Sequence, residues 1–220
     1  MASGESAPAE GRRERKKRET RQRISDIATG LMMDRGFDAV TIAEIAEAAD
    51  VSVNTVYNHF PAKEDLFFDR EEEMASRPSR IVRERKPGES AADALLKRMR
   101  ADVAERNIHG GAREGFEAFA RCVRDAPTLI ARLHVIQQRT ADHLAETLRE
   151  EASATPGDPR PDLVAGQLTN LGVVVFRSTS LAVARGVEED QVVRDALHRI
   201  DVFESLVSEE FLNYAVRSGG

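Results

Sequence analysis

Apolar residues recur at intervals of three and four along most of the chain, which is the pattern of amphipathic helices. Proline and glycine interrupt the pattern at a few places, and the segment ATPGDPRP has the composition of a loop. The spacing therefore predicts an all-α fold, with helices over about 19–35, 63–82, 90–107, 127–152, 162–185 and 189–216 and a further helix around 116–123.

Residues 41–60 predict two short helices joined by a tight turn. Thr41 precedes an apolar run, and Glu44 follows three residues later, which is the spacing of a capping box. Asp50 stands where the first helix must stop, and aspartate tolerates the left-handed backbone that a sharp turn needs. The two helices are thus expected to meet at an angle fixed by the turn.

The second of these helices has one apolar and one polar face. Ser52 is positioned to cap it, and Val56 and Phe60, four residues apart, point inward. The outward residues are short, polar and mostly uncharged, which suits a helix that lies in the major groove of DNA. They are Asn54, Thr55, Tyr57, Asn58 and His59.

The segments TIAEIAEAA and VSVNTVYNHFPAKEDLF, with a helix before them, resemble the DNA-binding domain of TetR-type transcription regulators. The resemblance covers about residues 18–70 in detail, and the rest of the chain is similar to the family only in length and helical character. Asp50 and Asn54 stand where the family often has glycine. Asn54 therefore adds a side chain to the face that reads DNA. We do not expect this protein to recognise the operator sequences of its relatives.

This resemblance implies an N-terminal three-helix helix-turn-helix DNA-binding domain followed by a C-terminal helical ligand-binding and dimerisation domain. We expect a disordered basic arm over 1–18, the DNA-binding domain over 19–62 and the second domain over 63–217. The charge agrees with this division: the net charge is −6, yet residues 11–23 hold eight basic and two acidic residues. A basic end on an acidic body is typical of a DNA-binding module joined to a domain that does not touch DNA.

The predicted DNA contacts fall into two groups. Base edges are expected to be read by Asn54, Thr55 and Asn58, since asparagine pairs with adenine and the threonine methyl group contacts that of thymine. Contacts to phosphates are expected from residues at helix N-termini, at the edge of the second helix and in the basic run, namely Thr41, Ser52, Tyr57, His59, Lys63, Arg18 and Arg21. Alternatively, Ser52 is only a cap, Tyr57 packs partly on the first helix, and the basic run is a solvated face.

The last two predicted helices are apolar around most of their circumference, so they need cover on several sides. We expect a two-fold homodimer in which they form a four-helix bundle with their mates, and the family resemblance implies the same arrangement. A monomer with an ordinary core is the alternative. The predicted interface residues are Phe176, Leu197, Ile200, Phe203, Val207 and Phe211.

The resemblance also implies a pocket for a small-molecule effector within residues 85–185. Candidates combine apolar walls with a few polar groups: Phe116, Phe119, Leu133, Gln137, Asn170, Val174 and Arg177. Phenylalanine without tryptophan favours an apolar effector. The aromatic pair is equally typical of a core, and Arg177 is equally suited to the dimer interface or to pairing with a carboxylate.

Catalytic and metal-binding patterns are absent from the sequence. Cys122 is the only cysteine, and the histidines show neither HxxxH nor HExxH spacing. We therefore expect no cofactor, no metal and no enzymatic activity. Since no apolar run reaches membrane-spanning length, we expect no membrane partner and a cytoplasmic location.

These observations predict a ligand-responsive transcriptional regulator that binds a pseudo-palindromic DNA operator as a homodimer, and the resemblance suggests a repressor. One alternative is a helical small-molecule-binding or catalytic protein with a vestigial helix-turn-helix. Another is an architectural DNA binder, which would show no sequence preference and no response to a ligand.

Overall fold

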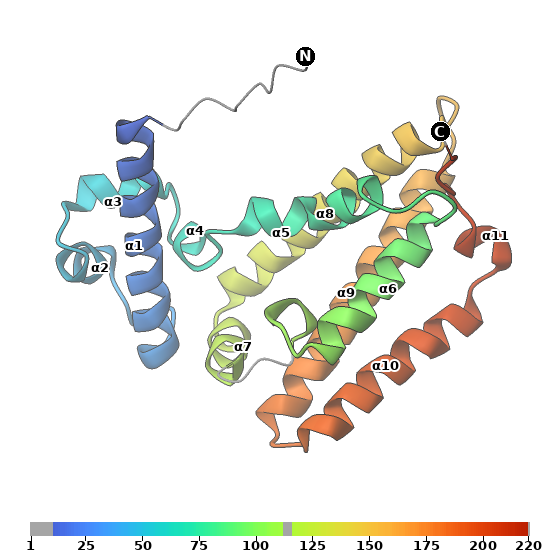
Figure 1. Cartoon of the computed structure of the whole chain (residues 1–220). Helices are drawn as coiled ribbons and strands as arrows, with labels where there is room; N and C mark the ends of the chain where they lie inside the picture. Colours follow the sequence, from blue (N-terminus) through green and yellow to red (C-terminus); the bar gives the residue numbers. More distant parts are fainter. Residues whose placement is uncertain (1–10, 112–115, 220) are drawn as a thin grey trace, which may run out of the picture. The chain divides into compact units, whose positions relative to one another are not determined.

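A computed structural model describes residues 11–111 and 116–219, and within them every regular element is a helix (Figure 1). The all-α fold expected from the sequence is therefore confirmed. The chain divides into two compact units, an N-terminal unit (Met1–Asp69) and a C-terminal unit (Arg70–Gly220). Within the described residues, none of the helices is long and apolar enough to cross a membrane.

The first helix, α1 (Arg12–Arg35), begins earlier than the sequence pattern suggested. Residues 12–18, expected in a disordered arm, form its first two turns. Arginine, lysine and glutamate are good helix formers, so a charged segment without apolar periodicity still continues the helix. Gly36 ends α1 with φ +93°, as its position predicted. The remainder of the expected arm, residues 1–10, lies outside the described residues.

Three shorter helices complete the N-terminal unit: α2 (Ile42–Ala48), α3 (Val53–His59) and α4 (Lys63–Phe67). Its core is buried and includes side chains from every helix: Ile24, Ala28, Met32, Ile45, Val56 and Leu66, with Phe60 after α3. The hydroxyl of Ser25, also buried, donates a hydrogen bond to the carbonyl oxygen of Leu66 over 3.1 Å. α1 is thereby attached to α4 by a polar contact as well as by packing.

The single helix predicted over 63–82 is wrong. α4 ends at Phe67, and α5 (Glu71–Arg83) begins only after a break at residues 68–70. Leu66, Phe67 and Phe68 are all buried, and three consecutive side chains cannot lie on one helical face. The chain leaves the helix at Phe68, whose ring then meets that of Phe67 edge to face at 5.2 Å. The boundary between the two compact units lies within this break.

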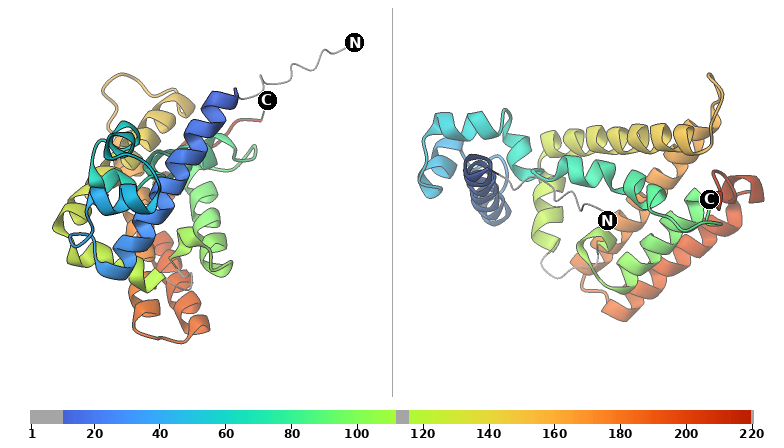
Figure 2. Two further views of the ribbon diagram at one scale, coloured as in Figure 1. Left: turned by 90° about the vertical axis from the view of Figure 1, so that its left-hand side faces the viewer. Right: turned by 45° about the horizontal axis from the view of Figure 1, so that its top comes forward.

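The C-terminal unit is a bundle of helices in which α8 (Pro127–Glu151) packs along both α5 and α9 (Arg160–Ala184) (Figures 1 and 2). α10 (Glu189–Leu206) packs on α9 and on α6 (Ala91–Ala104). The 3-10 turn η1 (Ile108–Gly110) follows α6, and α7 (Phe116–Asp125) contacts α8 and α9. The buried core of this unit includes Leu96, Leu144, Leu148, Leu168 and Ile200.

The helix predicted over 189–216 is also wrong in its second half. α10 ends at Leu206, Val207 is extended, and Ser208 caps the short helix α11 (Glu209–Leu212). The side chain of Ser208 accepts a hydrogen bond from the backbone N–H of Phe211. This bend brings the ring of Phe211 edge to face with that of Phe203 at 6.0 Å, against the core of the same unit.

A buried carboxylate joins α5 to α6. Asp102 accepts hydrogen bonds from Arg77 of α5 at 3.0 and 2.7 Å, from Arg98 at 2.7 Å and from Asn107 at 2.9 Å. Burial alone would raise the pKa of Asp102, but these hydrogen bonds outweigh it and hold that pKa below its usual value. Asp102 is therefore ionised at neutral pH and fixes the orientation of α5 on α6.

Candidate nucleic-acid interface

The geometry of α2, the turn and α3 follows directly from their capping residues. The hydroxyl of Thr41 accepts from the backbone N–H of Glu44 at 3.2 Å, and the Glu44 carboxylate accepts from that of Thr41 at 2.8 Å. Asp50 has φ +50°, the left-handed conformation expected at the turn. Ser52 then caps α3 by accepting from the N–H of Thr55 at 3.0 Å. The local signals in the sequence therefore predicted this motif correctly.

The carboxylate of Glu44 is the most strongly perturbed acid of the N-terminal unit. The backbone N–H of Thr41 and the guanidinium of Arg35, 2.6 Å away, are the main causes that lower its pKa from 4.5 to about 2. Because the folded-state pKa is depressed, the stabilisation is present above the unfolded value and is lost as pH falls from about 4.5 to about 2.

Glu44→Gln is therefore expected to lower the Tm of the protein at pH 7, where the ionised carboxylate completes the cap. The difference from the wild type should shrink as pH falls through this range and vanish near pH 2. Circular dichroism melts at several pH values would measure it. Glu47→Gln, at an exposed position of the same helix, is the control. A deficit of Glu44→Gln that is independent of pH would contradict the assignment.

The two faces of α3 differ as the sequence predicted. Val56 and the following Phe60 are buried, whereas Ser52, Asn54 and Asn58 are exposed. Tyr57 keeps half of its surface accessible. Thr55 and His59 are half-buried, and the hydroxyl of Thr55 lies 2.8 Å from that of Ser52. The exposed face of α3 is thus polar and carries hydrogen-bonding groups suited to base edges and phosphates.

Lys63 and Arg21, both expected at phosphates, have their cationic groups engaged within the N-terminal unit. The ammonium group of Lys63 donates to the carbonyl oxygen of Phe37 at 2.5 Å and lies 4.4 Å from the centre of its ring. The guanidinium of Arg21 donates to the carbonyl oxygen of His59 and lies 4.1 Å from the centre of the Phe60 ring. Both contacts hold the ends of helices together, a role that local sequence did not indicate.

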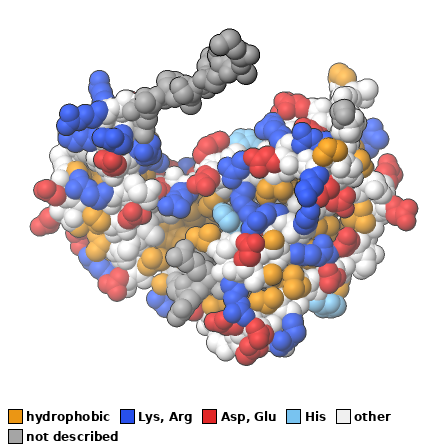
Figure 3. Space-filling view, in the orientation of Figure 1, with side chains coloured by type: hydrophobic (Ala, Val, Ile, Leu, Met, Phe, Trp, Pro, Cys, Tyr) orange, Lys and Arg blue, Asp and Glu red, His pale blue; other side chains and the backbone are white. Residues whose placement is uncertain are grey.

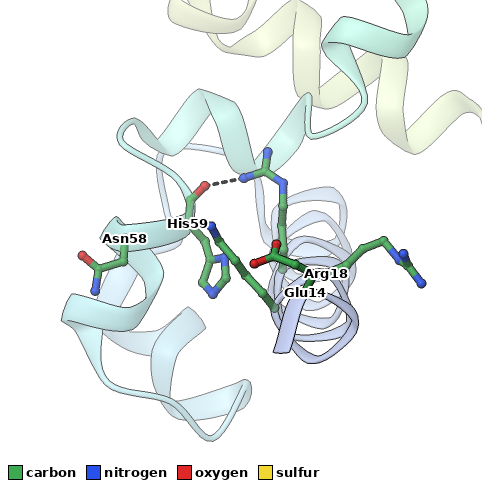
Figure 4. A pocket seen from close by; sticks show the side chains of 6 residues that line it. Glu14, Arg18, Asn58 and His59 are labelled. Carbon is green, nitrogen blue, oxygen red and sulfur yellow. Dashed lines mark hydrogen bonds between the residues drawn. The ribbon is translucent and has the colours of Figure 1, made fainter. Parts of the chain in front are cut away.

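The basic run forms one end of α1 and is exposed from Arg12 to Arg18. In Figure 3, lysine and arginine side chains gather over this end of the helix, at the upper left. A shallow groove lies between this part of α1 and the end of α3. It is lined by Glu14, Lys17, Arg18, Arg21, Asn58 and His59 (Figure 4). A half-buried histidine and three cations thus lie beside the helix that presents the polar face.

Of the six predicted interface residues of the C-terminal unit, one is buried and five are half-buried. Ile200 is fully buried in the core of its own chain, so its side chain offers no surface to a partner. Leu197, Phe203 and Phe211 pack against the same core, and Val207 and Phe176 are half-buried. The exposed apolar residues of α9 and α10 are instead Leu163, Val173, Val174, Leu181, Val202 and Leu206. Helical periodicity identified an apolar helix, but it did not show which of its faces packs within the same chain and which face is left exposed.

The predicted pocket residues separate into two groups. Phe119 of α7 and Leu133 and Gln137 of α8 are half-buried on helices that contact each other. Asn170, Val174 and Arg177 are exposed on α9, three to four residues apart along one face. The side chain of Phe116 lies outside the described residues. The structure therefore does not unite the seven candidates in one site.

In the part of the chain that the structure describes, His, Cys, Asp and Glu form no group of three or more that could hold a metal ion. Cys122 is buried, and the four histidines outside α3 lie on the helices of the C-terminal unit or in η1.

A capped helix, a left-handed turn and a second helix with a polar outer face define a helix-turn-helix DNA-binding protein. Residues 24–69 match the family described as "Bacterial regulatory proteins, tetR family". This part of the chain is therefore similar to the DNA-binding domain of the family, and a protein named as a transcriptional regulator matches most of the chain.

Three known proteins illustrate the similarity. The HTH-type transcriptional regulator TcmR of Streptomyces glaucescens is 27% identical over 173 residues, which is 76% of either chain. NalD, the secondary repressor of the MexAB-OprM multidrug efflux pump in Pseudomonas aeruginosa, superimposes with a TM-score of 0.59 at 18% identity, covering 88% of this chain and 99% of NalD. SmeT in its complex with triclosan gives 0.56 at 17% identity, covering 88% and 94%. The two structures establish the likeness of the fold.

Proposed function

We propose that this regulator is a repressor that binds a pseudo-palindromic operator as a homodimer and is released by an apolar small molecule. The observation that carries the proposal is α3, a capped helix whose outer face is polar and whose inner face is buried. One such helix contacts too few bases to locate a site in a genome. Two copies about 34 Å apart, one turn of DNA, would read two half-sites together. We expect it to act in the cytoplasm.

Within α3, we assign base reading to Asn54, Thr55 and Asn58. Asn54 and Asn58 are four residues apart, so their exposed side chains lie on one face of the helix. The remaining predicted DNA contacts, Thr41, Ser52, Tyr57, His59 and Arg18, are proposed to hold phosphates. For Lys63 and Arg21 we propose a supporting role, because their cationic groups already bind carbonyl oxygens of this unit.

Asn54→Ala is expected to relax sequence preference while retaining most non-specific affinity, with a loss of about 1–3 kcal/mol on the preferred site alone. Selection of bound duplexes from a random pool, repeated with the variant, would measure the change at each position. Tyr57→Phe is the control, since loss of a phosphate contact weakens binding to all sequences alike. If Asn54→Ala weakened binding equally on every sequence, its assignment to base reading would be wrong.

For the dimer, we propose the exposed apolar residues of α9 and α10 in place of those expected from periodicity. Leu163, Val174 and Leu181 lie along one side of α9, and Val202 and Leu206 extend this surface onto α10. These two helices pack against each other, and we propose that one partner covers the exposed apolar residues of both. Pairing about a two-fold axis would bury this surface in a four-helix bundle.

We place the effector in the C-terminal unit, beside Phe119, Leu133 and Gln137 on α7 and α8. SmeT, whose fold is similar, was solved with triclosan, which supports a small, largely apolar ligand. The same α8 packs along α5, the first helix of this unit. An effector that binds one arrangement of α5 and α8 more tightly than another would change the affinity for DNA by linkage.

Salt dependence tests the proposed function against its alternatives. Four or more phosphate contacts per half-site would make affinity for duplex DNA fall by a factor on the order of 10³ between low and moderate salt. A protein with a vestigial helix-turn-helix would show no duplex binding while remaining folded. An architectural binder would show the salt dependence but no preferred sequence in the selection experiment.

A further inference from the structure

The groove between α1 and α3 has a distinctive set of charges. Glu14 and Arg21 are each three or four residues from the adjacent pair Lys17 and Arg18, so the four lie on one side of α1. His59 faces them from the end of α3; in Figure 4 its ring is directed toward α1, whereas Asn58 points away. The groove therefore contains three cations and one carboxylate around a single imidazole, with a net charge that favours an anion.

Arg21 holds this groove together. Its guanidinium donates to the backbone carbonyl of His59 and covers the ring of Phe60, so it binds α1 to the end of α3. Its positive charge lies next to the imidazole, although its hydrogen bond is made to the backbone carbonyl of His59 and not to the ring. The ammonium of Lys17 and the imidazole of His59 also line the groove and are the groups that we expect to meet a ligand.

The imidazole of His59 is uncharged at neutral pH in the protein without DNA. Burial is the main cause that lowers its pKa below 6.5, and the positive charges of Arg21 and Lys17 lower that pKa further. Arg18 and Glu14 complete the charged groups that line the groove on α1, and Asn58 and Phe60, its neighbours along the chain, carry no charge. An anion bound in this space would offset the nearby positive charges and favour the imidazolium form of His59.

We propose that this groove binds one phosphodiester group of DNA and that His59 takes up a proton from solvent as the phosphate enters. The imidazolium then donates a charge-assisted hydrogen bond to the phosphate. The proposal rests on the proposed function, since it assumes that α3 approaches duplex DNA. It adds that DNA binding by this protein is linked to protonation.

The sign of the linkage follows from the two states. The bound state holds the proton up to a higher pH than the free state, so binding consumes a proton between the two pKa values. Affinity for DNA rises as pH falls through this window and levels off once the free protein is itself protonated. One unit of difference between the two pKa values gives about a tenfold change in affinity per subunit.

The test is the affinity of the full chain for a labelled 20-bp duplex of arbitrary sequence, measured from pH 8 to pH 5.5 at constant salt. Phosphate contacts do not depend on sequence, so the operator is not needed. For the wild type we expect affinity to rise about 3- to 10-fold more than for His59→Gln, which keeps a hydrogen-bonding group that does not titrate. His134→Gln, at an exposed position of α8, should behave as the wild type.

Two further measurements make the outcome unambiguous. Lys17→Gln should weaken binding at every pH and reduce the slope of log affinity against log salt by about 0.9 per subunit. An NMR titration of His59 should give a higher pKa with DNA than without it. Equal pH dependence in the wild type and His59→Gln, with binding intact, would overturn the linkage and leave the proposed function standing. No duplex binding by the wild type would overturn both.

Discussion

Arg85→Ala is expected to lower the free energy of unfolding of the C-terminal unit by about 3–5 kcal/mol, more than any other single substitution proposed. The side chain of Arg85 is completely buried just after α5. Its guanidinium donates to the carbonyl oxygens of Val82 at 2.6 Å, Ala215 at 2.8 Å and Glu89 at 3.2 Å. It also pairs with the carboxylate of Glu151 at 2.7 Å.

The large effect follows from what alanine would leave behind. Three carbonyl oxygens and the partly exposed carboxylate of Glu151 would lose this donor, and each buried group left unsatisfied costs free energy. The loss would also remove one of the contacts that attach the C-terminal segment, since this guanidinium binds the carbonyl oxygen of Ala215. Arg85→Lys should recover only part of the stability, because one ammonium group cannot reproduce the planar set of donors.

Urea unfolding followed by circular dichroism would measure these differences. Arg83→Ala is a matched control two residues away, since Arg83 pairs with Glu150 at 3.1 Å with both side chains about half exposed. Such an exposed pair contributes about 0–1 kcal/mol, so the control should unfold close to the wild type. Equal destabilisation by the two substitutions would show that burial is not what makes Arg85 important.

Sequence revealed the helix-turn-helix because each of its signals is local. Thr41 and Glu44 are three residues apart, and Ser52 caps an amide three residues further on. Asp50 adopts its left-handed conformation at the position where the first helix had to stop. Each interaction closes within a few residues of chain, so pattern and spacing were sufficient to place the motif, its buried face and its exposed face.

The contacts that sequence did not reveal join distant segments. Arg85 and Ala215 are 130 residues apart, and Arg21 and the carbonyl of His59 are 38 apart. Helical periodicity does not indicate which of two apolar faces packs in the core of the same chain. Ile200 is therefore buried within its own unit, whereas Val174, expected in a pocket, is exposed. The break at Phe68 has the same origin, since it depends on the packing of Phe68 against the N-terminal unit.

Val174→Asp is expected to dissociate the dimer and to reduce affinity for a two-half-site operator by a factor on the order of 10² or more. Val174 lies midway along α9 with about a third of its surface accessible, on the face that we assign to the partner. A two-fold axis would bring two such carboxylates into one interface, each desolvated and unpaired at a cost of several kcal/mol. A monomer then binds each half-site alone, without the gain in effective concentration that linkage provides.

Val135→Asp on α8 is the matched control, because Val135 is slightly more exposed than Val174 and lies on a different helix. Light scattering after size-exclusion chromatography would give the mass of each variant, and binding to duplexes with one or two half-sites would give the functional consequence. If Val174 lined an effector site instead, its substitution would leave the mass of a dimer and change only the response to ligand. If Val135→Asp disrupts the dimer and Val174→Asp does not, the interface lies on α8. An introduced aspartate destabilises the dimer only where the interface buries its carboxylate.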